Sequence, residues 1–226
     1  MSYADRMLIG VFWKQIKSWL SGIMSSGGGG NSGAVDGNGI GGSGETDRIS
    51  KPQTITVSSV TKTYGSKPFS LKAKTSGNGK INYKCSNKKT AVISKCGKVT
   101  VKGYGKSVVT VKAKKTPEYR EAVKKITVHV IPKKVSITKT YSPESRKVVC
   151  NWRRDRTVDG YEVYLSRKSD FLSQTFKRVF KSSVTNMSLV GLESNKTYYI
   201  RMRSYKKVGE ETCYGIWSKV KKVKVK

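Results

Sequence analysis

The sequence predicts an all-β protein with two tandem β-sandwiches, preceded by a short amphipathic α-helix and a flexible Gly-rich linker. Three observations predict this fold class. Beyond residue 50, apolar and polar residues alternate in short runs separated by turn residues, which is typical of half-buried strands. Before residue 25, apolar residues recur every three or four positions, as on one face of a helix. Between these parts, residues 25–44 contain ten glycines and too few apolar residues to order themselves.

The predicted helix spans residues 4–24, and the linker spans residues 25–50. Lys14 and Lys17 interrupt the apolar run that a secretory signal peptide needs, and the segment is too polar for a transmembrane helix. Because the linker separates it from the sandwiches, we expect the helix to dock into a groove on a partner protein, with flat binding on a membrane as the alternative. The anchoring face consists of Ile9, Phe12, Trp13, Ile16, Trp19, Leu20 and Ile23.

The first sandwich is predicted over residues 52–132, where six or seven short alternating runs favour two packed antiparallel sheets. Lysines fill many of the alternate, outward positions. The residues expected to face the core are Phe69, Leu71, Ala73, Ile81, Tyr83, Cys85, Val99, Val101, Val109, Val111, Ile126, Val128 and Val130.

The segment "INYKCSNKKTAVISKCGKVTVKGYGKSVVTVKA" in this block resembles the group 2 bacterial immunoglobulin-like domain. The matching features are an aromatic strand with Tyr83, an S-N turn, an "AVIS" strand, a G-K-V run and a later glycine. They lie at Tyr83, Ser86, Asn87, Ala91 to Ser94, Gly97 to Val99, and Gly103. The resemblance implies an immunoglobulin-like sandwich with Tyr83 in its core, and it implies no particular ligand.

The second sandwich is predicted over residues 134–226, where "VVCNW" and "GYEVYLS" alternate and "GIWSKVKKVKVK" closes the chain. This block resembles a fibronectin type III domain. The resemblance implies a tyrosine corner, in which the hydroxyl of a buried tyrosine bonds to upstream backbone. It also implies structural core positions at Trp152, Tyr161, Leu192, Tyr198 and Trp217. Because the sequence contains no Arg-Gly-Asp, integrin binding is not implied. Both families are commonest on bacterial surface proteins and on the exteriors of phage particles.

The formal charge is +32, from 46 Lys and Arg against 14 Asp and Glu. The excess lies in the sandwiches: residues 51–132 hold 19 cations and 2 anions, and residues 133–226 hold 23 and 8. Such a surface attracts polyanions at low salt. We expect it to meet an anionic cell-wall polymer or glycan, although solvated strand faces alone would also explain it. Nucleic acid is a less favoured ligand, because most of the aromatic residues that alternation assigns to a strand face are expected in the core.

The sequence predicts no catalytic residues, no cofactor site and no metal site. His129 is the only histidine, so neither a Ser-His-Asp unit nor a His-rich metal site can form within the chain. Alternation places His129 on an outer strand face. Three carboxylates, Asp155, Asp159 and Glu162, lie among arginines in "RRDRTVDGYE", where we expect an ion-paired turn rather than an acid and base pair.

The four cysteines show neither zinc spacing nor a clear disulfide pattern. Cys85 and Cys150 are expected on inner faces, and Cys96 and Cys213 in turns. Four free thiols are the main expectation, with a bridge between Cys85 and Cys96 as the alternative. Free thiols suit assembly in a reducing cytoplasm.

Together these features predict a non-catalytic display protein. The helix would anchor it to a larger assembly, such as a capsid or tail, and the basic sandwiches would adhere to a host cell surface. Since the chain begins at Met1 without an export signal, we expect a phage virion decoration or appendage protein, assembled in the host cytoplasm and exposed on the virion surface. The alternatives are a secreted or wall-associated bacterial surface adhesin, with an extracellular location, and a basic nucleic-acid-binding protein.

Overall fold

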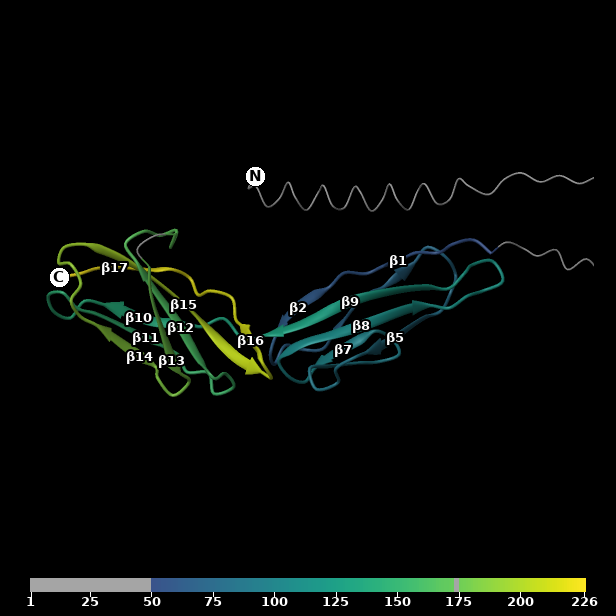
Figure 1. Ribbon diagram of the computed structural model, residues 1–226, viewed down its shortest axis with the longest axis horizontal. Helices are drawn as coiled ribbons and strands as arrows, with labels where there is room; N and C mark the ends of the chain where they lie inside the picture. Colours follow the sequence, from purple (N-terminus) through teal and green to yellow (C-terminus); the bar gives the residue numbers. More distant parts are fainter. Residues whose placement is uncertain (1–49, 173–174) are drawn as a thin grey trace, which may run out of the picture. The chain divides into compact units, whose positions relative to one another are not determined.

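The computed structural model describes residues 50–172 and 175–226, and every regular element in these ranges is a β-strand (Figure 1). The prediction of an all-β body is therefore confirmed. The predicted helix, with its anchoring residues, and the linker up to residue 49 lie outside the described residues. Within the described ranges, no helix is long and apolar enough to cross a bilayer.

The first sandwich combines a four-stranded sheet, β2-β9-β8-β5, with a three-stranded sheet, β3-β7-β6, and a small pair, β1-β4. Its longest strands, β8 and β9, pair antiparallel from Gly105 opposite Val130 to Ala113 opposite Ala122. The strand bounds are β1 Ile55–Thr56, β2 Val60–Thr63, β3 Phe69–Ser70, β4 Lys74–Thr75, β5 Ile81–Cys85, β6 Ala91–Ile93, β7 Lys98–Val101, β8 Gly105–Ala113 and β9 Ala122–Ile131.

One pairing departs from the predicted antiparallel arrangement, because β2 runs parallel to β9, with Val60 opposite Val128. Parallel neighbours need a long connection, and here most of the first sandwich lies between the two strands in sequence. Alternation within a strand carries no information on the direction of its neighbour, so the sequence pattern could not reveal this pairing.

The alternation of Phe69, Leu71 and Ala73 is typical of one strand, but this segment forms two, β3 and β4, which belong to different sheets. The break lies at Lys72, whose φ of 48° is in the left-handed region. Such a residue cannot continue an extended strand. β3 therefore pairs with β7 and β4 with β1, so the chain changes sheets at this edge.

All of the predicted inward residues of the first sandwich are either buried in its hydrophobic core or, like Phe69, Ala73, Ile81, Tyr83 and Val101, half-buried against it. Val99, Val111 and Val128 are completely buried, and Tyr83 is half-buried against the cluster. Gly97 allows the tyrosine to pack there, since a Cβ on this glycine would lie 2.8 Å from the ring of Tyr83. The inner faces of the two sheets, which carry β-branched and aromatic side chains, thus pack together into one core.

The second sandwich packs a three-stranded sheet, β10-β11-β14, against a five-stranded sheet in which β15 pairs with β12, β16 and β17. All of its strand pairs are antiparallel. The strand bounds are β10 Ile137–Tyr141, β11 Val148–Trp152, β12 Gly160–Ser166, β13 Thr175–Lys181, β14 Asn186–Leu189, β15 Thr197–Val208, β16 Glu211–Tyr214 and β17 Lys221–Lys224.

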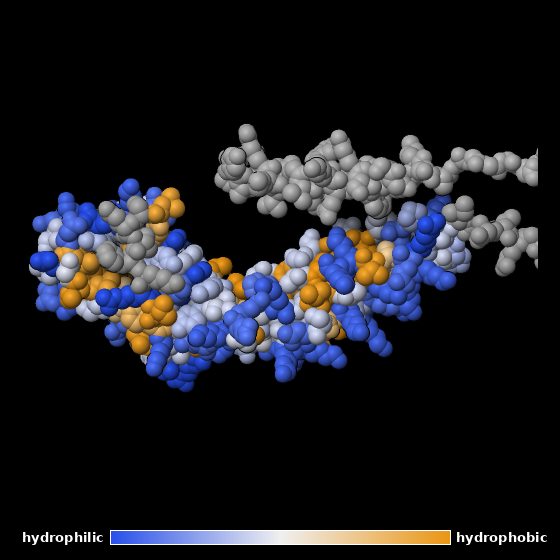
Figure 2. Space-filling view, in the orientation of Figure 1, coloured by the Kyte–Doolittle hydropathy of each residue, from blue (hydrophilic) through white to orange (hydrophobic). Residues whose placement is uncertain are grey.

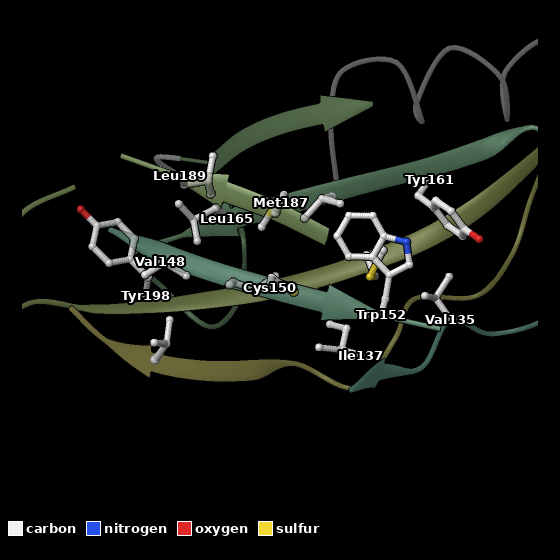
Figure 3. Close-up of a cluster of buried hydrophobic side chains, with 14 of the residues drawn as sticks. Val135, Ile137, Val148, Cys150, Trp152, Tyr161, Leu165, Met187, Leu189 and Tyr198 are labelled. Carbon is white, nitrogen blue, oxygen red and sulfur yellow. The ribbon is translucent and has the colours of Figure 1, made fainter. Parts of the chain in front are cut away.

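The core of this sandwich has a tyrosine at each of two opposite ends, and each hydroxyl points out of the cluster (Figure 3). Tyr198 accepts a hydrogen bond from the backbone N–H of Glu193 at 3.2 Å. This is the tyrosine corner that the fibronectin resemblance implies. Tyr161, at the other end, packs edge-on against Trp152 with ring centroids 5.7 Å apart.

Candidate anion-binding site

Five cationic side chains line a hollow of about 390 Å³ at the end of the second sandwich where the chain enters it. Its lining comes from the connector between β9 and β10, from the loop between β11 and β12, and from Tyr161 on β12. The lining residues are Lys133, Lys134, Val135, Ser136, Arg153, Arg154, Asp155, Arg156 and Tyr161.

Backbone and core contacts hold the two lining segments together. The N–H of Arg153 donates to the carbonyl of Ser136 at 3.0 Å, which joins the loop to the connector. The N–H of Asp155 donates to the hydroxyl of Tyr161 at 2.7 Å. Because the Tyr161 ring is completely buried, this bond ties the loop to the rigid core. Burial also raises the pKa of Tyr161, so the hydroxyl stays protonated at neutral pH.

One oxygen of the only carboxylate of the hollow is occupied within its own loop. Asp155 Oδ1 accepts hydrogen bonds from the Thr157 N–H at 2.9 Å and from the Thr157 hydroxyl at 2.6 Å. This is an Asx turn, in which the side chain takes the place of a backbone turn. The expected ion-paired turn is therefore wrong at Asp155, because the carboxylate stabilises the loop without an ion pair to a neighbouring arginine.

The five cations are exposed, and within the described ranges none of them forms an ion pair with a carboxylate. One of them is held in place: the Nε–H of Arg154 donates to the Ser182 carbonyl at 3.1 Å. Like charges around a concave, partly apolar wall reinforce one another's potential. The planar guanidinium of arginine also matches the oxygens of phosphate or carboxylate groups in a bidentate fashion. The geometry therefore suits an anionic ligand.

The other two carboxylates of this region do form ion pairs. Asp159 accepts from Lys206 Nζ at 2.6 Å and from the Lys207 N–H at 2.8 Å. Partial burial favours its neutral acid, but these two hydrogen bonds outweigh burial and lower its pKa. Glu162 lies inside β12 rather than in a turn, is only 3% exposed, and contacts Arg203 Nη2 at 2.7 Å. The two carboxylates thus serve different ion pairs and form no acid and base pair.

Two further arginines are covered by aromatic rings on the outer face of the five-stranded sheet. Arg201 and Arg203 each lie 4.5 Å from the centroid of Trp217, and Arg203 lies 3.8 Å from that of Tyr214. Cation–π contacts of this kind stabilise the sheet but leave the arginines less available to a ligand. Trp217 is half-buried here and does not belong to the core cluster, which corrects its predicted core position.

The other predicted core residues of the second sandwich, Trp152, Tyr161, Leu192 and Tyr198, all lie in the cluster.

The cysteines are free thiols, so no Cys85 to Cys96 bridge is present. Cys213 is buried in β16 rather than in a turn, and burial raises its pKa.

Lysines elsewhere lie on exposed strand positions and in loops, and hydrophilic residues cover most of the visible surface in Figure 2. Lys112 illustrates this class, since it is exposed and pairs with Glu121 at 2.7 Å. His129 is half-buried on β9, where burial and the charge of Lys106 lower its pKa. The described residues contain no cluster of three or more side chains suited to a metal ion.

The sequence pattern did not predict this hollow, although the basic runs "PKK" and "RRDR" contribute its five cations. The two motifs are twenty residues apart, and only the pairing of the connector with the loop brings them together.

Comparison with solved structures shows similarity to fibronectin type III and related β-sandwich domains. The FN1–FN3 domains of chicken CNTN1 match at 12% identity over 78% of this chain and 68% of that chain, with a TM-score of 0.38. The fn3 domain of human contactin 1 matches at 17% identity over 41% and 75%, with a TM-score of 0.33. No family model and no curated protein matches the chain, so the group 2 bacterial immunoglobulin-like assignment stays a prediction.

Proposed function

We propose that this protein is a non-catalytic display protein that adheres to anionic polymers of a host cell surface. The observation that carries the proposal is the basic hollow, where five exposed cations lie together and form no ion pair with any carboxylate of residues 50–172 and 175–226. An isolated cluster of this kind costs electrostatic repulsion, which a bound polyanion would relieve. The exposed lysines elsewhere on both sandwiches add a weaker, diffuse attraction to the same surface.

The experiment is sedimentation of the purified protein with bacterial cell walls, before and after chemical removal of their anionic polymers. We expect binding to intact walls at low salt and little binding to stripped walls. If the five cations each neutralise one charge on a single-stranded polymer, affinity should fall about 100-fold between about 50 and 200 mM salt. Equal binding to stripped walls, or binding that resists salt, would contradict the proposal.

We further propose that the N-terminal segment anchors the protein to a larger assembly, with a phage capsid or tail as the favoured partner. Its support is the apolar stripe between Ile9 and Ile23 and the glycine-rich linker that follows. Loss of one central aromatic anchor from a protein groove typically costs about 2 kcal/mol or more. Trp19→Ala should therefore stay in the supernatant when mixed with particles that lack the protein, whereas Lys14→Ala, on the polar face, should still sediment. Flotation of the wild type with neutral liposomes would instead indicate a membrane anchor.

A further inference from the structure

A second basic hollow, of about 340 Å³, adjoins the first. The two hollows share Lys134, Val135 and Ser136, so the connector before β10 lines both of them. The second hollow adds the buried Ile137 and two exposed cations from the end of the sheet, Lys219 and Lys221. Neither lysine forms an ion pair with a carboxylate in the described part of the chain.

We propose that the two hollows form one track for a linear polymer whose repeating anionic groups are phosphates. The proposal rests on the proposed function and specifies its ligand. Seven cations line the track: Lys133, Lys134, Arg153, Arg154, Arg156, Lys219 and Lys221. The two central apolar side chains, Val135 and Ile137, are each 8% exposed and present no polar group to a ligand.

The hydrogen-bonding capacity of the track favours phosphate over a sugar-rich glycan. Sugar hydroxyls need acceptors as well as donors, and acceptors are few here: the track holds seven cations against one carboxylate, that of Asp155, and two serine hydroxyls, those of Ser136 and Ser218. Asp155 accepts two bonds from Thr157. The hydroxyl of Ser218 accepts from the Met202 N–H at 3.1 Å and donates to the Lys219 carbonyl at 3.0 Å. The exposed groups are thus mainly charged donors, which fit a ligand that offers oxygen acceptors at regular intervals.

The same residues argue against a nucleic acid as the ligand. Proteins that bind single-stranded nucleic acid usually stack bases on exposed aromatic rings. Tyr161 is the only aromatic residue that lines either hollow, and its ring is completely buried. Phosphates would be bound here, but no ring is exposed to hold a base.

The test measures the affinity of the full-length protein for inorganic polyphosphate chains of increasing length, from pyrophosphate upwards, and for poly(glycerol phosphate). One variant, Arg153→Gln with Arg156→Gln, removes two charges from the first hollow. Another, Lys219→Gln with Lys221→Gln, removes two from the second. The matched control is Lys84→Gln with Lys125→Gln, which removes two exposed lysines of β5 and β9 that form no ion pair among the described residues.

For long chains we expect each hollow variant to lose about 25-fold in affinity at about 0.1 M salt, because each phosphate contact on a flexible chain is worth about fivefold there. Each variant should also lower the slope of log affinity against log salt by about 1.4. The Lys219→Gln and Lys221→Gln variant should lose affinity for long chains but not for pyrophosphate, since a chain must span both hollows to gain from both. The control should change affinity less than threefold.

Three results would overturn the track. They are equal losses in the control and the hollow variants, no dependence of affinity on chain length, and tighter binding of single-stranded DNA than of polyphosphate. A wild type that binds no polyanion would instead refute the proposed function itself. Preferential binding of poly(glycerol phosphate) over polyphosphate would identify a cell-wall polymer as the source of the phosphates, and the reverse preference would identify free polyphosphate.

Discussion

Tyr161→Phe removes one hydroxyl that connects the core of the second sandwich to the candidate site. The ring is fully buried against Trp152, and phenylalanine preserves that packing. Two interactions of this hydroxyl are lost: the 2.7 Å hydrogen bond that it accepts from the Asp155 N–H, and the longer one, at 3.4 Å, that it donates to the Asp155 carbonyl. Since Asp155 is half-buried, its amide would be only partly rehydrated, and the free energy of unfolding should fall by about 1–2 kcal/mol.

A loss of 1 kcal/mol lowers the melting temperature of a domain of this size by about 4–8 °C. Thermal unfolding followed by tryptophan fluorescence measures the change, because Trp152 and Trp217 are the only tryptophans beyond residue 50 and both lie in the second sandwich. Binding of long polyphosphate should also weaken although the net charge is unchanged, because the loop that carries Arg153 to Arg156 loses its attachment to the core.

The matched control is Tyr141→Phe, since Tyr141 is exposed and its side-chain contact with Lys139 is to the ring and not to the hydroxyl. It should melt like the wild type. The reasoning is refuted if Tyr161→Phe melts within about 1 °C of the wild type, or if the two variants lose the same stability.

Further predictions concern titration, thiols and autonomy of folding. Asp159 has a lowered pKa, so its contribution to stability is present above the unfolded value of 3.8 and is lost as the pH falls through the folded value. Asp159→Asn should therefore be less stable than the wild type at pH 7 and lose less stability on acidification below about pH 4; parallel acid denaturation curves would contradict this. In a thiol assay with an aromatic disulfide reagent, the exposed Cys96 should react rapidly in the native protein, and Cys85, Cys150 and Cys213 only in denaturant. Rapid reaction of all four in the native state would mean that the sandwiches open readily. A fragment of residues 52–226 should give a β-type circular dichroism spectrum and a cooperative melt, because it contains every described residue of the two cores, from Ile55 to Val225; an aggregated fragment would show that the N-terminal segment belongs to a core.

The strands and their inner faces could be predicted because side chains alternate along a strand, so a run such as "VVTVKA" marks its own buried positions. Alternation predicted the wrong result where the backbone departs from an extended strand. Lys72 has a left-handed conformation that ends β3, and Trp217 precedes the last strand and lies on the outer face against arginines. Neither the conformation of one residue nor the choice of sheet face after a bend is encoded in periodicity.

The candidate site depended on contacts that are distant in sequence. Charge counts showed that the body of the protein is basic, and they could not show whether any cations lie together without partners. That was decided by the hydrogen bond between Arg153 and Ser136, by the Asx turn of Asp155, and by the adjacency of Lys134 to Lys219 and Lys221 in one hollow. The sequence by itself thus determined most of the strands, most of their inner faces and the net charge, because these follow from local alternation and composition. The tertiary structure alone decided which charges converge, because convergence depends on which strands and loops pair across the fold.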